Sequence, residues 1–95
     1  AWGVPPGEEP AANDSLATTI QFRMPQGERV RRRFALQEPV AHLFGHVAQL
    51  LQLEGHGGRL DDLVAPPARS LKGGDLGLTI EQAGLKNASL LVKLA

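Results

Sequence analysis

The sequence predicts an α+β fold in which a mixed sheet of four to five strands packs on one main helix. Apolar and polar residues alternate near the start and at the end of the chain, which is typical of half-buried strands. Between residues 40 and 51 apolar residues instead recur every three or four positions, which indicates a helix. A chain of 95 residues has room for one such domain.

The first 17 residues have the composition of a flexible linker, so we expect residues 1–17 to be a linker and 18–95 to be the folded domain. Three of the seven prolines lie in this stretch, with glycines and little apolar periodicity. Trp2 and Val4 are bulky apolar residues within it, and a docking role for them stays open beside the plainer interpretation as linker sequence.

A hairpin is predicted next. Thr18 to Met24 alternates as a strand, and Pro25-Gln26-Gly27 fits a tight turn, because proline presets φ and glycine accepts positive φ. Arg29 to Phe34 continues as the second strand. Strict alternation puts Arg32 on the core face, so we expect a bulge or an edge position to relieve it.

The helix is predicted from near Pro39 to near Leu53. Its apolar stripe lies on one face, Pro39 suits the first turn, and Gly55 marks the end. His42 and His46 share a face four residues apart, but with no third ligand evident we expect two solvated histidines and no metal site.

The remaining elements are shorter. We expect a third strand over 59–64, which Asp61-Asp62 interrupts, and a fourth over 69–71. A helical turn over 79–83 follows, with Thr79 as its cap and Gly84 as its stop, and then a strand over 89–94. This order is the β-grasp arrangement, in which the last strand lies between the first and third and runs parallel to the first.

Composition excludes several functions. Ten basic residues balance ten acidic ones, and the arginines are not interleaved with aromatic residues, so no nucleic acid is expected. No segment approaches the length of a membrane span, and the absence of cysteine fits the cytoplasm or nucleus. No nucleophile motif is present, so we expect no enzyme and no cofactor.

Four segments together resemble the UBX family of ubiquitin-like domains, from about residue 18 to 94. They are residues 20–27 (IQFRMPQG), 32–34 (RRF), 79–85 (TIEQAGL) and 88–92 (ASLLV). The resemblance implies an adaptor module that binds the N-domain of the valosin-containing AAA+ ATPase in ubiquitin-dependent protein handling. It implies a monomer as an isolated domain.

The resemblance also implies where the partner binds. UBX domains use an arginine of the first strand, which Arg23 matches, and a Phe-Pro-Arg loop between the third and fourth strands. Here that loop reads VAPPAR over 64–69 and has no phenylalanine. Its paired prolines resemble the loop of the branch that tethers glucose-transporter vesicles. The implied contact residues are Arg23, Ala65, Pro66, Pro67, Ala68 and Arg69.

The arginines of the second strand leave alternatives open. Arg29, Arg31, Arg32 and Arg33, with Arg23 on the neighbouring strand, form a basic stripe that could meet carboxylates, or be solvated charges that protect an edge strand from aggregation. Arg31 and Arg33 are the members that could form a patch beside the contact loop. Two other kinds of partner fit the same pattern. One is a small GTPase, bound as by a Ras-association domain through the basic second strand, and the other is a second copy of a self-associating scaffold domain.

Overall fold

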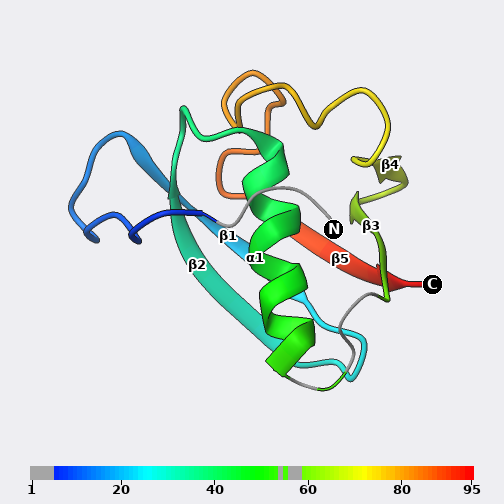
Figure 1. The fold of residues 1–95 in the computed structure, drawn as a ribbon. Coiled ribbons are helices and arrows are strands. Elements are labelled where there is room, and N and C mark those ends of the chain that lie inside the picture. The colour runs from blue at the N-terminus through cyan, green and yellow to red at the C-terminus, as the bar shows by residue number, and fades with distance from the viewer. Residues whose placement is uncertain (1–5, 54, 56–58) are drawn as a thin grey trace.

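A computed structural model describes residues 6–53, 55 and 59–95 of the chain (Figure 1). The elements in order are β1 (Ala17–Arg23), β2 (Arg29–Ala35), α1 (Val40–Leu53), β3 (Leu60–Ala65), β4 (Arg69–Ser70) and β5 (Ser89–Leu94). Trp2 and Val4, for which a docking role was left open, lie outside the described residues. No helix among those residues is long and apolar enough to span a membrane.

The five strands form one mixed sheet in the order β2-β1-β5-β3-β4. The last strand, β5, lies between β1 and β3; it runs parallel to β1 and antiparallel to β3. The single helix α1 lies across one face of this sheet (Figure 1). The β-grasp prediction, including the insertion of the last strand, is therefore confirmed.

The core fills the space between α1 and the sheet. Alternate residues of β1 and β5 point to the helix, and the apolar stripe of α1 points to the sheet, so the apolar face of each element is removed from water. The largest fully buried side chains belong to Ile20, Phe22, Met24, Phe34, Val40, Leu43, Phe44, Leu51, Leu63, Leu71, Ile80 and Leu90.

The helix begins at Val40, at the predicted start near Pro39. Pro39 forms an isolated bridge to Thr79, and the first helical residue is Val40. The N–H of Val40 donates to the carbonyl of Leu78 at 2.8 Å, so part of the helix N-terminus is satisfied by a distant loop. At the other end Gly55 has φ of 82°, the left-handed conformation of a residue that stops a helix.

Arg32 lies on the core side of β2, as strict alternation requires. The β1–β2 register runs without a bulge, and the relief comes from the edge position of β2, because Arg32 can extend past the edge of the sheet. Its guanidinium carbon lies 4.7 Å from the centre of the Phe34 ring, so the positive charge lies over an aromatic face.

A register shift between Leu60 and Asp62 explains how β3 tolerates two consecutive aspartates. Asp62 is buried, and its carboxylate accepts hydrogen bonds from the N–H of Leu63 (2.8 Å), the hydroxyl of Ser70 (2.5 Å) and the N–H of Lys72 (3.2 Å). A buried carboxylate is tolerable only when it is bonded in this way. Asp62 therefore ties β3 to the residues that follow the contact loop.

The segment before β5 closes as a single hydrogen-bonded turn. The Thr79 hydroxyl accepts from the N–H of Gln82, and the Gln82 side-chain oxygen accepts from the N–H of Thr79, each at 3.0 Å. This reciprocal pair is the capping arrangement expected for Thr79. Gly84, with φ of 71°, ends the turn as predicted.

The expectation of two solvated histidines is wrong for His46. Its ring is half-buried, with its centre 5.6 Å from that of Phe22 and 5.7 Å from that of Phe34, because the helix face toward the hairpin is wider than the apolar stripe alone. Its buried Nε2 has no hydrogen-bond partner within the described chain. Burial, with the Arg32 charge as a smaller cause, lowers the pKa of His46 to about 4.

Candidate functional site

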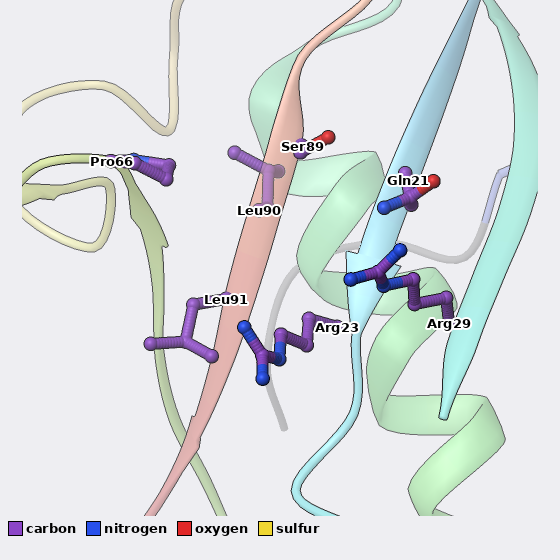
Figure 2. A pocket seen from close by; sticks show the side chains of 7 residues that line it. All are labelled: Gln21, Arg23, Arg29, Pro66, Ser89, Leu90 and Leu91. Atoms are coloured by element: carbon purple, nitrogen blue, oxygen red, sulfur yellow. The ribbon is translucent and has the colours of Figure 1, made fainter. Parts of the chain in front are cut away.

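A groove lies on the face of the sheet that α1 leaves uncovered, between the start of β5 and the hairpin. Its volume is about 330 Å³. It is lined by Gln21, Arg23, Arg29, Pro66, Ser89, Leu90 and Leu91, which come from β1, β2, β5 and the turn after β3 (Figure 2). Residues separated by up to 70 positions in the sequence thus form one surface.

Two arginines dominate the electrostatics of the groove. Arg23 and Arg29 are directly opposite each other in the β1–β2 register, and both are exposed. In the described part of the chain neither forms an ion pair with a carboxylate; the arginines that do are Arg33 and Arg69. Like charges directly across a ladder destabilise a sheet, so the pair is placed at some cost to the fold.

The rest of the groove is apolar. Leu91 points outward from β5 and is 41% exposed, although a large aliphatic side chain is usually covered. Figure 2 shows Leu91 extending from β5 toward β3 and Arg23 extending from β1 toward β5, with Pro66 on the other side of β5 from the arginines. The groove therefore offers two guanidinium groups, each able to bind a carboxylate through paired hydrogen bonds, beside a surface for an apolar side chain.

Of the loop residues predicted to make contacts, Pro66 is the one that lines the groove. Pro66, Pro67 and Ala68 form the turn between β3 and β4, and the Pro66–Pro67 peptide bond is cis. Ala65 is half-buried and pairs with Arg69 across the two strands. Pro67 and Ala68 are exposed next to the groove without lining it.

Arg69 is used to hold the loop. Its Nη1 donates to the carbonyl of Ala83 at 2.6 Å, and its Nη2 lies 3.1 Å from the carboxylate of Asp75. These bonds direct its guanidinium to the segment before β5, and it does not line the groove. Arg69 thus joins two neighbouring segments of the same chain.

The two arginines predicted as a basic patch diverge. Arg31 lies beside the groove, since its Nε donates at 3.1 Å to the side-chain oxygen of Gln21, a lining residue. Arg33 pairs with Thr19 near the other end of β2, and its side chain bonds to residues that precede β1: Nε donates to the carbonyl of Pro10 at 2.7 Å. The two side chains therefore bond to different parts of the chain, Arg31 beside the groove and Arg33 at the segment before β1.

Leu91 was missed at the level of the sequence, whereas Arg29 was expected in the basic stripe but was not named among the contact residues. A turn over 24–28 puts Arg29 directly opposite Arg23. Leu91 carries no such local signal. Its role depends on the parallel pairing of β1 with β5, in which Arg23 and Leu91 are register partners.

Neither the groove nor the helix carries a metal-binding arrangement. Within the described ranges no three histidine, cysteine, aspartate or glutamate side chains gather closely enough to hold a metal ion. His42 Nδ1 lies 2.8 Å from the carboxylate of Glu38, its neighbour one helical turn earlier.

Comparison with known proteins agrees with this geometry. The model of the UBX domain family matches residues 12–94. The chain is 32% identical over 83 residues to the UBX domain-containing protein 2 of Schizosaccharomyces pombe, covering 87% of this chain and 18% of that relative.

Two solved structures resemble the fold. One is the solution structure of a UBX domain, with a TM-score of 0.72 and 26% identity, covering all of this chain and 85% of the other. The second is a designed protein based on ubiquitin, with a TM-score of 0.60 and 16% identity over 84% of this chain and 90% of the other. At that identity the second likeness concerns the fold alone.

Proposed function

The chain belongs to the UBX domain family of protein-interaction modules, and on that premise we propose that it is an adaptor that binds the N-domain of the valosin-containing AAA+ ATPase. The observation that carries the proposal is the opposed pair Arg23 and Arg29, which have no carboxylate partner among the described residues and share a groove with exposed Leu91. A location in the cytoplasm or nucleus belongs to the same proposal.

The arginine pair supplies the polar part of the contact. Each planar guanidinium can donate two parallel hydrogen bonds to a carboxylate of the partner. A partner carboxylate between them also removes the repulsion between the two arginines, so binding gains more than either pair would alone. Arg31, through its bond to Gln21, adds positive charge beside the groove.

The apolar part of the contact differs from that of relatives with a Phe-Pro-Arg loop, because no phenylalanine is present. Pro66 and Leu91 take its place as the apolar surface of the groove. The proposed contact set over the loop remains Ala65, Pro66, Pro67, Ala68 and Arg69. Within it, Pro66 touches the partner and Arg69 orients the loop through Ala83 and Asp75.

Calorimetric titration of the chain with the isolated ATPase N-domain tests the proposal. Arg23→Gln removes a guanidinium at the centre of the contact, and such losses typically cost about 2 kcal/mol, or roughly 30-fold in Kd. Pro66→Gly is expected to weaken binding through the loss of apolar contact and of a restrained loop.

Arg59→Gln is the matched control. Arg59 is exposed, lies outside the groove and donates a 3.3 Å bond to the carbonyl of Ala95. The affinity of Arg59→Gln for the ATPase N-domain should equal that of the unsubstituted chain. Unchanged Kd in both Arg23→Gln and Pro66→Gly, or an equal loss in Arg59→Gln, would contradict a contact in the groove.

The small-GTPase alternative makes a different demand on the structure. It requires a strand of the partner to pair with the outer edge of β2. Part of that edge already bonds to Glu9, whose carboxylate accepts from the N–H of Arg33 at 3.0 Å. We therefore favour the groove, and binding that depends on the nucleotide state of a GTPase would favour the alternative.

A further inference from the structure

A short segment that precedes the first strand lies against the outer side of β2. Three contacts hold Gly7, Glu9 and Pro10 there. Arg32 Nη2 donates to the carbonyl of Gly7 at 2.8 Å, and Arg33 Nε donates to the carbonyl of Pro10 at 2.7 Å. In Figure 1 this dark blue segment passes beside β2.

Glu9 makes the third contact and reaches the backbone of the strand itself. Its Oε2 accepts from the N–H of Arg33 at 3.0 Å and lies 3.7 Å from the Arg33 guanidinium. Because β2 is an edge strand, that N–H is one of the groups a further strand would use for pairing. The Glu9 carboxylate thus takes the place of a carbonyl from another chain.

The charges around Glu9 favour this contact. The hydrogen bond from the N–H of Arg33, and then the positive charges of Arg33 and Arg32, hold the pKa of Glu9 below its ordinary value. His46 of α1 also faces Glu9, and Glu9 opposes the lowering of its pKa. Arg33 and Arg32 therefore favour a carboxylate at this position.

We propose that residues 7–10 form a docked strap that closes the β2 edge, so that an extended acidic segment of another chain must displace it to pair with β2. The strap makes few contacts, so it docks reversibly and is compatible with a linker over 1–17. It lies near Arg33, about 14 Å along β2 from Arg29 and the groove, at roughly 3.4 Å per residue. The inference therefore stands apart from the proposed function.

Amide hydrogen exchange of the whole chain, measured by NMR, tests whether the strap is docked in solution. In Glu9→Ala the Arg33 amide loses its charged acceptor and should exchange about tenfold faster. Glu8→Ala is the matched control, because Glu8 is the adjacent exposed glutamate and forms no ion pair within the described residues. Equal Arg33 exchange in Glu9→Ala, Glu8→Ala and the unsubstituted chain would overturn the proposal.

Competition by a peptide tests whether the strap excludes other acidic segments. The probe is a synthetic peptide of residues 6–11 (PGEEPA), with a second peptide that has glutamine at the Glu9 position as its control. An attached segment acts at an effective concentration in the millimolar range, so the first peptide should shift the amides of residues 31–35 at lower concentration in Glu9→Ala than in the unsubstituted chain.

Each other outcome counts against the proposal. Equal shifts in both proteins would mean that the strap does not block the edge. Shifts centred on Gln21 and Leu91 would mean that acidic peptides bind the groove, and no shift in Glu9→Ala at several millimolar would mean that the edge does not accept such segments.

Discussion

Acid should destabilise this domain in a way that depends on His46. The folded chain lowers the pKa of His46 from the usual 6.5 to about 4. Between these values the unfolded chain takes up a proton that the folded chain refuses, so stability present above about pH 6.5 is lost as the pH falls toward 4. Below about pH 4 both states are protonated, and this contribution stops changing.

The size of the effect follows from the shift. About 2.5 pH units at 1.36 kcal/mol per unit give an upper limit of roughly 3 kcal/mol. The ring packs against Phe22 and Phe34, and its Nε2 has no hydrogen-bond partner among the described residues, so protonation would place a charge beside apolar rings and near Arg32. A loss of roughly 3 kcal/mol is a large part of the 5 to 15 kcal/mol by which a typical domain is stable.

Urea unfolding followed by helix circular dichroism at pH 7, 5.5 and 4.5 measures this. Between pH 7 and 4.5 the free energy of unfolding of the unsubstituted chain should fall by about 2 kcal/mol more than that of His46→Phe, because the variant lacks the titrating group. His42→Gln serves as the control, because His42 lies one helical turn before His46 and contacts the Glu38 carboxylate. Parallel pH profiles for the unsubstituted chain and His46→Phe would refute the reasoning.

Two further changes should destabilise the fold by predictable amounts. Asp62→Ala leaves three donors without their acceptor and should lower the free energy of unfolding by about 2 to 3 kcal/mol. Asp61→Ala loses only an exposed pair with Lys72 Nζ and should lower it by less than about 1 kcal/mol. Urea unfolding of both variants compares them, and equal losses would contradict the buried role of Asp62. Thr79→Ala removes a cap and should lower stability by about 1 kcal/mol, while Ser89→Ala, in β5, should change it little. Thermal unfolding of both would show whether the cap matters.

The periodicity of the sequence was enough to predict the sheet order and the main helix. Alternation in β1 and β5 and the stripe of α1 are local signals, and burying all three apolar faces at once leaves few arrangements. The position of Arg32 was also predicted, because alternation places it on the core side of β2, where its long side chain can extend past the edge of the sheet.

The site was less accessible from the sequence because it depends on non-local register. Arg23 was identified by resemblance and Arg29 as part of the basic stripe, but their direct opposition emerges only from the pairing of two strands. Arg69, which was expected at the contact by resemblance, bonds to Ala83 and Asp75 within the chain, and no spacing rule indicates those bonds. The burial of His46 likewise depends on how far the hairpin extends over the helix.

The central claim is that Arg23 and Arg29 are kept opposite each other for binding, at a cost to the fold. Measuring both the free energy of unfolding and the affinity for the ATPase N-domain in Arg29→Gln tests it most directly. Stability should rise by about 0.5 kcal/mol, because the repulsion is relieved, while affinity falls by roughly tenfold or more. A variant that loses stability and keeps its full affinity would contradict the claim.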